Sequence, residues 1–216
     1  MPLPKTLIKS DCDDREYRFV ELANKMKCLL ISDMQADMSA AAINVHIGSA
    51  SDPRPLYGVA HFLEHMLFQG TEKYPIENEY SEFMKNNGGY DNAFTSLTDT
   101  NYHFEVSNEG FEEGLDRLSQ FFISPNFSEN SAAREVNAVD SEWEMSKQSD
   151  GWHFYNLTCA LSEKESNYNR FACGNKASLA NPTIRESLLE FHKKWYSANI
   201  MTLCVCGKES LDWLEK

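Results

Sequence analysis

The order of strand-like and helix-like segments constrains the fold of this chain more than any other feature of its sequence. Strand-like runs occupy residues 17–22, 26–31, 41–47, 92–97, 102–107 and 200–206. Apolar residues at helical spacing occupy residues 56–68, 78–85, 110–122, 128–147, 151–161 and a helix opened by Pro182. Most strands come early, helices follow and one strand returns, so we expect an α+β fold with a mainly antiparallel β-sheet backed by helices.

Local signals predict how several of these segments begin and connect. The segments at residues 23–25 and 98–100 are short and mostly polar, and each is expected to form the turn of a β-hairpin. Pro75 is predicted to open the helix at 78–85, and Ser128 or Ser131 is predicted to cap the long helix that follows.

The length and composition indicate one ordinary globular domain, which we place at residues 1–216. Hydrophobic residues make up 42% of the chain and charged residues 25%. No apolar run approaches the roughly 18 residues that a membrane span needs. The 33 acidic residues outnumber the 20 basic ones and give a net charge of −13, which argues against nucleic acid or an anionic membrane as a partner.

The cysteines and the first residues of the sequence predict a cytoplasmic protein with free thiols. The first 16 residues lack a long apolar stretch and carry four acidic side chains, which is unlike a signal or transit peptide. The chain is also too rich in core residues to need a disulfide framework. Cys204 and Cys206 lie two apart in an apolar run, so we expect them to be buried thiols rather than metal ligands.

The segment His61-Phe62-Leu63-Glu64-His65 carries the clearest chemical signal. Residues four apart lie on one face of a helix, so His61 and His65 can present ring nitrogens to one metal ion. Zinc lowers the pKa of the water it binds to about 7, and a glutamate at position 64 can take the proton. The alternative is a surface helix with two solvated histidines, but the apolar residues flanking the motif favour burial, where unpaired ionisable groups are costly.

A catalytic zinc ion usually has three protein ligands, so a third ligand is required. Glu135 and Glu142 lie two helical turns apart and share a face of the predicted helix at 128–147. One of them can bind the metal while the other orients a ligand histidine. The spacing does not decide between these roles, and a pair of glutamates at this spacing is more often a solvated face.

Several long blocks of the sequence resemble one known family. The blocks HFLEHMLFQGTEKYPIENEYSEF, GGYDNAFTSLTDTNYHFEVS, GLDRLSQFF and REVNAVDSEWE occur in the order found in the insulysin branch of the pitrilysin-type zinc peptidases. The resemblance extends from about residue 15 to residue 214. It implies the fold of that family, an α+β roll, and a zinc-dependent endopeptidase activity on small unfolded peptides.

The resemblance also implies roles for individual residues. It assigns one zinc ion to His61, His65 and Glu142, the general base to Glu64, and a supporting role near the histidines to Glu135. Residues Asn92, Ala93, Phe94 and Thr95 match the edge strand that pairs with the substrate backbone, a mode of peptide binding that physical chemistry also supports. Trp152 and Tyr155 match a region where the family places aromatic residues near its cleft, although core packing is the expectation for both.

The complete enzymes of this family are several times longer and enclose their substrate between two halves. We therefore expect either a truncated gene product or a subunit that needs a partner, such as a complementary C-terminal half or a second copy. The alternative function is a non-catalytic peptide-binding or regulatory domain. Two histidines and a carboxylate favour zinc, but these ligand types also accept manganese or cobalt.

Overall fold

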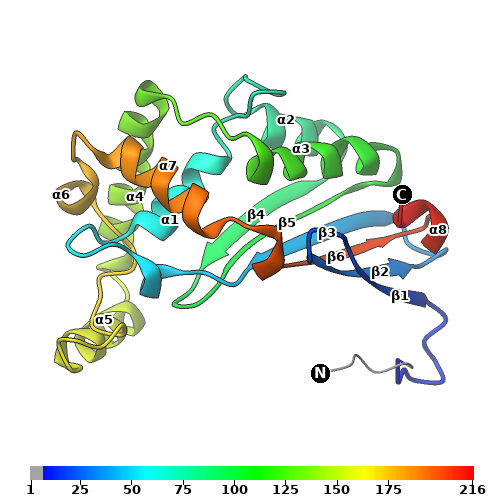
Figure 1. Cartoon of the computed structure of the whole chain (residues 1–216), viewed down its shortest axis with the longest axis horizontal. Coiled ribbons are helices and arrows are strands. Elements are labelled where there is room, and N and C mark those ends of the chain that lie inside the picture. The colour runs from blue at the N-terminus through cyan, green and yellow to red at the C-terminus, as the bar shows by residue number, and fades with distance from the viewer. Residues whose placement is uncertain (1–6) are drawn as a thin grey trace.

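The computed structural model describes residues 7–216, in which one mixed sheet carries helices on one of its faces (Figure 1). The strands are β1 (Glu16–Glu21), β2 (Lys27–Ser32), β3 (Met38–Val45), β4 (Tyr90–Thr95), β5 (Thr100–Ser107) and β6 (Met201–Gly207). The helices are α1 (Val59–Leu67), α2 (Glu79–Asn86), α3 (Phe111–Ile123), α4 (Glu129–Ser146), α5 (Asp150–Leu161), α6 (Lys176–Leu179), α7 (Ile184–Trp195) and α8 (Leu211–Leu214).

The strands lie in the order β1-β2-β6-β3-β5-β4. Neighbouring strands are antiparallel except for β2 and β6, which run parallel. Both predicted hairpins form, since β1 pairs with β2 and β4 pairs with β5. The predicted α+β class with a mainly antiparallel sheet is therefore confirmed, and β6 enters the middle of the sheet.

Alternation along the strands separates a helix-covered face from an open one. In β3, Ser39, Ala41, Ile43 and Val45 are buried while the residues between them are only half-buried. Figure 1 shows α2, α3 and α7 above one face of the sheet, and apolar side chains from these helices and α1 form a single core with it. The large aromatic side chains Tyr102 and Phe104 of β5 lie at its centre. This packing fixes α1 against the end of the sheet formed by β4 and β5.

The open face corrects the prediction for Cys204 and Cys206. Both thiols are half-buried rather than buried, because they alternate with Val205, which points to the helix-covered face. Their neighbours in the sheet are Leu29 and Ile31 of β2 on one side. All the cysteines are free thiols, as predicted.

Helix α4 begins as its sequence predicts. Ser128 has extended backbone angles, and its side-chain oxygen accepts a hydrogen bond from the backbone N–H of Ser131 at 3.0 Å. This bond satisfies one of the N–H groups left free at a helix N-terminus. Among the two predicted capping residues, the structure selects Ser128.

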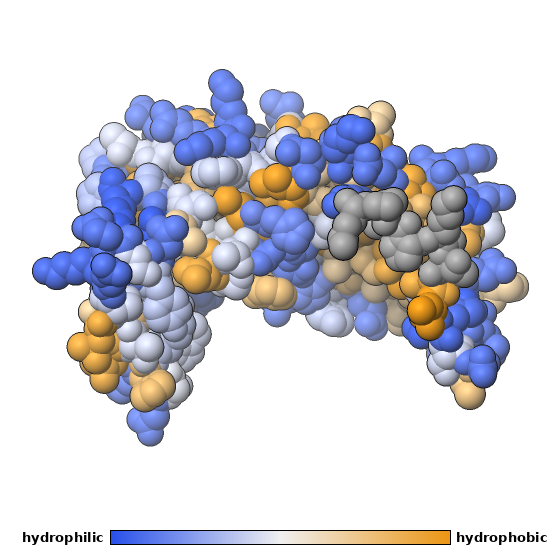
Figure 2. All heavy atoms as spheres, turned by 60° about the horizontal axis from the view of Figure 1, so that its bottom comes forward, coloured by the Kyte–Doolittle hydropathy of each residue, from blue (hydrophilic) through white to orange (hydrophobic). Residues whose placement is uncertain are grey.

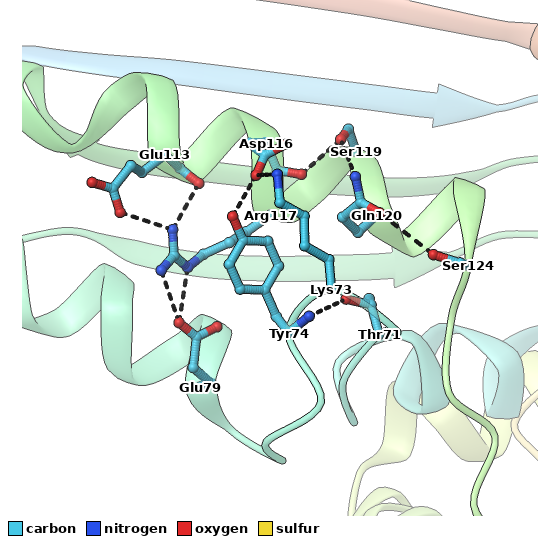
Figure 3. A network of polar contacts seen from close by, with 10 residues as sticks. All are labelled: Thr71, Lys73, Tyr74, Glu79, Glu113, Asp116, Arg117, Ser119, Gln120 and Ser124. Carbon is cyan, nitrogen blue, oxygen red and sulfur yellow. Dashed lines mark hydrogen bonds and ion pairs between the residues drawn. The ribbon is translucent and has the colours of Figure 1, made fainter.

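The sequence predicted that Pro75 opens helix α2, but this prediction is wrong. The helix begins at Glu79 after Asn78, whose φ of 62° lies in the left-handed region. Pro75 belongs instead to the loop between α1 and α2, which a polar network ties to α3 (Figure 3). Lys73 and the Tyr74 hydroxyl both bond Asp116, and these long-range contacts are invisible in local periodicity.

The centre of this network is Arg117 (Figure 3), whose guanidinium lies over two aromatic rings. The guanidinium carbon is 4.4 Å from the ring centroid of Tyr74 and 3.9 Å from that of Phe83. The same group bonds Glu79 at 2.9 Å and Glu113 at 3.1 Å. A cation held on both ring faces and by two carboxylates fixes the loop to α3.

Helix α5 projects from the body of the molecule (Figure 1). Several of its apolar side chains are exposed. Figure 2 shows hydrophobic side chains gathered on this arm, and the molecule is hollowed beside it. None of the helices within residues 7–216 has the length and apolar content needed to cross a bilayer.

Candidate metal centre

The motif residues lie on α1, as predicted, and helical geometry brings the two histidine rings together. The ring centroids of His61 and His65 are 4.8 Å apart in an edge-to-face arrangement. The apolar side chains of α1 are buried on the opposite side, among them Phe62, Leu63 and Met66. The amphipathic pattern of the helix therefore points both imidazoles toward α4, which packs against α1.

Glu142 of α4 completes a set of three metal-ligand atoms. One carboxylate oxygen of Glu142 lies 3.5 Å from His61 Nε2 and 3.4 Å from His65 Nε2. The ligand atoms of the three residues all lie within 4.8 Å of one another. Two imidazole nitrogens and a carboxylate oxygen are the donor set of many catalytic zinc sites, so the residues present fit a zinc ion.

The other nitrogen of each ring already has a partner. His61 Nδ1 donates to the carbonyl oxygen of Cys173 at 2.7 Å, and His65 Nδ1 lies 3.2 Å from a carboxylate oxygen of Glu135. Such contacts orient the ring and leave Nε2 for the metal. The structure therefore brings Glu135 and Glu142 to different nitrogens of His65, which distinguishes the two roles that the sequence spacing left open.

Glu135 and Glu142 raise the pKa of His65, which lies between them. Burial by itself lowers the pKa of His65, but its hydrogen bonds to Glu135 and Glu142 bring that pKa to about 10. The hydrogen bond from His65 lowers the pKa of Glu142. The charged form of Glu142 is therefore favoured beside the imidazole.

Glu64 lies beside the three ligand atoms and is only 7% exposed. The hydroxyl of Thr95 in β4 donates a hydrogen bond of 2.5 Å to its Oε2. Burial raises the pKa of the Glu64 carboxyl, although both histidines and Thr95 oppose the shift. A carboxylate with a raised pKa is a stronger base than one in water, which suits the proton acceptor of a hydrolytic site.

The four predicted substrate-binding residues lie on β4, at the edge of the sheet. Within the described residues β4 pairs with β5 alone, so its outer edge has no strand beside it. Asn92 and Phe94 are exposed, and Asn92 Oδ1 accepts a hydrogen bond from the backbone N–H of Ala93 at 2.9 Å. Thr95 points to the other face, where it meets Glu64 rather than solvent. Alternation along the strand predicts this opposite orientation, since Thr95 directly follows Phe94.

A cleft of about 530 Å³ joins the metal-ligand cluster to this edge strand. Its walls include the three ligand residues, Glu64, β4 and the side chain of Trp152 from α5. Trp152 is 48% exposed, which corrects the prediction that it packs in the core. Tyr155 is half-buried and lies behind it, in edge-to-face contact with the Trp152 ring.

Two residues that sequence reasoning missed support α1 from a distance. Asp52 is buried, and its carboxylate accepts hydrogen bonds from the backbone N–H groups of Gly58 at 2.7 Å and Ala60 at 2.8 Å. It caps the helix from six residues upstream, although Gly58 occupies the capping position. The Cys173 carbonyl comes from a loop more than a hundred positions beyond His61. The only local sequence signal for the Asp52 contact is an Asp before a helix, and the Cys173 contact leaves no such signal.

Comparison with known proteins agrees with this geometry. Residues 27–165 match the family model described as Insulinase (Peptidase family M16), and residues 183–216 match the Peptidase M16 inactive domain. The chain is 50% identical to the insulin-degrading enzyme of Homo sapiens over 212 residues, which cover 95% of this chain and 21% of that protein. It is 46% identical over 213 residues to the A-factor-processing enzyme of Saccharomyces cerevisiae, covering 96% of this chain and 21% of that protein.

Two solved structures show the same fold. The crystal structure of pitrilysin superimposes with a TM-score of 0.95 at 35% identity, covering all of this chain and 23% of that one. A protease from Helicobacter pylori gives a TM-score of 0.82 at 21% identity and covers 93% of this chain and 48% of that one, a likeness in fold alone. The chain spans about a fifth of the length of the curated relatives it matches. On its sequence, its fold and its cluster of two histidines and a glutamate, it belongs to the M16 (insulinase) family of peptidases.

Proposed function

We propose that this chain is a zinc-dependent endopeptidase domain that hydrolyses peptide bonds of small unfolded peptides. The observation that carries the proposal is the convergence of His61, His65 and Glu142 to within 4.8 Å beside the buried carboxyl of Glu64. Membership of the M16 family supports the same conclusion.

The three converging residues would hold the metal. Their donor set fits one zinc ion, and each histidine keeps its Nδ1 bonded to a protein group, which leaves Nε2 to coordinate. A zinc ion in such a site supplies Lewis acidity that activates water and polarises a peptide carbonyl. Glu135 would hold the ring of His65 in place.

Glu64 would act as the general base and then return the proton to the leaving amine. Its burial supports this role by raising its pKa. The Thr95 hydroxyl donates to Oε2, so this bond fixes the orientation of the carboxylate and leaves Oε1 for the proton.

An extended peptide would bind as an added strand along β4. Among residues 7–216 no strand pairs with the outer edge of β4, so this edge supplies main-chain donors and acceptors beside the cluster. Main-chain pairing is independent of side-chain sequence. Phe94 and Trp152 are exposed on the cleft and offer apolar contacts to substrate side chains. Only an unfolded segment presents the free backbone that this edge requires, which supports small unfolded peptides as the substrate class.

The relatives are about five times longer than this chain, so we extend the proposal to its assembly. Enclosure of the peptide and stabilisation of the developing oxyanion would come from a complementary partner or a second copy. Loss of one oxyanion donor costs about 10²–10³ in kcat, so turnover by the chain alone should be slow.

The test measures bound metal and peptide cleavage together. Plasma mass spectrometry should find about one zinc ion per wild-type chain and much less in His65→Ala. A quenched-fluorescent peptide should be cleaved by the wild type and not by Glu64→Gln, which keeps its three ligands and therefore its zinc.

Each outcome has a distinct meaning. Equal cleavage by both proteins would reveal a contaminating protease. Zinc without cleavage would support a sound metal site that needs its partner, whereas peptide affinity unchanged by chelation, without product, would favour the alternative of a non-catalytic peptide-binding domain. A folded wild-type chain without zinc would refute the proposed function.

A further inference from the structure

Residues 170–176, the end of the loop after α5 and the first residue of α6, contact both α1 and α4, the two helices that carry the candidate metal ligands. On the α1 side, the Cys173 carbonyl accepts the hydrogen bond from His61 Nδ1 at 2.7 Å. On the α4 side, the Phe171 ring lies edge to face against Trp143 with centroids 4.7 Å apart. The backbone N–H of Lys176 also donates to Asp140 of α4 at 2.9 Å.

The segment approaches α1 through a direct contact between two backbones. A side chain added at Gly58 would place its Cβ 2.4 Å from the Cα and 2.7 Å from the N of Gly174. A Cβ added at Gly174 would lie 3.2 Å from the Gly58 Cα and 2.9 Å from a methyl carbon of Leu179. Both glycines have positive φ, 87° at Gly58 and 78° at Gly174. Only glycine fits both the conformation and the space.

The same end of α1 is held by one further group from the segment. Arg170 Nη1 donates a hydrogen bond of 2.6 Å to the backbone carbonyl of Asp52. The Asp52 carboxylate in turn bonds the N–H groups of Gly58 and Ala60. The N-terminus of α1, the glycine contact and the Cys173 carbonyl therefore form one connected unit.

We infer that residues 170–176 are a positioning element of the metal site, in which the Gly58–Gly174 contact sets the Cys173 carbonyl that orients His61. A carbonyl oxygen only accepts hydrogen bonds, so His61 Nδ1 is the donor in this contact and Nε2 is the ring nitrogen that faces Glu142. Because the segment also bonds α4, it sets the separation of the helices that carry the histidines and the glutamate. The expected effect on zinc affinity rests on the proposed function, whereas the hydrogen bond from His61 to Cys173 can be tested without zinc.

The experiment compares three glycine variants of the 216-residue chain. Gly58→Ala and Gly174→Ala introduce a Cβ into the backbone contact. Gly88→Ala is the matched control, because Gly88 also has a positive φ, 69°, but nothing lies within 4 Å of an added Cβ. Zinc affinity is measured by competition with a chelator, and folding is checked by circular dichroism and urea unfolding of the metal-free chains.

Gly174→Ala and Gly58→Ala should weaken zinc binding by roughly 10- to 100-fold, the usual range for losing a group that orients a metal ligand. Gly88→Ala should leave the affinity within about twofold of wild type, since its strain is local to a turn where the added Cβ contacts nothing. If Gly174→Ala folds and binds zinc as tightly as wild type, or if all three variants lose affinity equally, the inference is wrong.

A second measurement does not depend on the glycine variants folding. In the metal-free wild-type chain, histidine ¹⁵N NMR should show a His61 Nδ1 proton protected from exchange by its bond to Cys173. Phe171→Ala, which removes the contact with Trp143 and keeps both glycines, should reduce this protection and weaken zinc binding relative to the wild type. An unprotected Nδ1 proton in the wild type would overturn the inference, whereas absence of zinc binding with a protected proton would overturn only the proposed function.

Discussion

Replacing Asp52 with Asn should change how the stability of the chain depends on pH. The Asp52 carboxyl is 3% exposed and accepts two backbone hydrogen bonds at the N-terminus of α1. Burial raises its pKa to about 7, and the hydrogen bonds from Ala60 and Gly58 only partly oppose this shift. Two effects therefore compete at Asp52, and burial outweighs the two hydrogen bonds.

The sign follows from proton binding in the two states. In the unfolded chain Asp52 ionises with its ordinary pKa of 3.8, whereas the folded chain keeps the proton up to about pH 7. The stabilisation from the protonated carboxyl is complete below pH 3.8 and is lost as the pH rises to about 7. Each pKa unit corresponds to about 1.36 kcal/mol, so between pH 5 and pH 8 the wild type should lose about 3 kcal/mol that Asp52→Asn does not lose.

Urea unfolding of both proteins at pH 5, 6, 7 and 8 measures this difference directly. Other titrating groups are common to both proteins and cancel in the difference. The unfolding free energy of Asp52→Asn, relative to wild type, should rise between pH 5 and pH 7 and then level off. A difference that stays constant across this range would show that Asp52 is ionised throughout and that the two hydrogen bonds outweigh its burial.

Three further substitutions test other parts of the structure. Arg117→Met should lower the unfolding free energy, measured with urea, by about 2–4 kcal/mol, because it leaves the half-buried Glu79 without its cation. Adding Glu79→Gln should restore part of this loss, and no recovery would contradict the pairing of Arg117 with Glu79. Thr95→Val should lower kcat about 10- to 100-fold with zinc content unchanged, because it removes the hydrogen bond to Glu64, whereas Thr95→Ser should retain activity. Equal rates in the wild type and both variants would exclude a role for Thr95 in orienting Glu64. Phe94→Ala should weaken peptide binding in fluorescence titrations but change stability by less than about 0.5 kcal/mol, since the side chain is 53% exposed; unchanged affinity would remove Phe94 from the cleft.

The sequence predicts the elements of this fold well where a segment carries its own signal. The period of α1 places His61 and His65 on one face, and the cap at Ser128 marks the start of α4. Both hairpins follow from short polar turns between strand-like runs. The choice of Glu142 as the candidate ligand needed more than spacing. Glu135 lies on the same helical face, and local sequence does not show which of the two reaches Nε2 of His65.

The remaining features depend on contacts between distant segments. The start of α2 at Glu79 depends on a loop held by Asp116 and Arg117 of another helix, so Pro75 alone was misleading. Cys204 and Cys206 are half-buried because the sheet has helices on one face, which an apolar run does not reveal. The Cys173 carbonyl is a backbone group, and residue identity carries no signal for it.

The central place of β6 has a consequence for the order in which the molecule can form. Residues 201–207 separate β2 from β3, so the hairpin of β1 and β2 has no bond to the rest of the sheet until β6 arrives. Loop closure over almost the whole chain must precede the parallel pairing of β2 with β6, which makes this step slow. On the ribosome, the early strands and the helices must wait for the last strand, with the edges that β6 will cover still unpaired. This domain therefore completes its sheet only after residues 201–207 have been made, and until then the edges of β2 and β3 that β6 will cover stay open to wrong pairing.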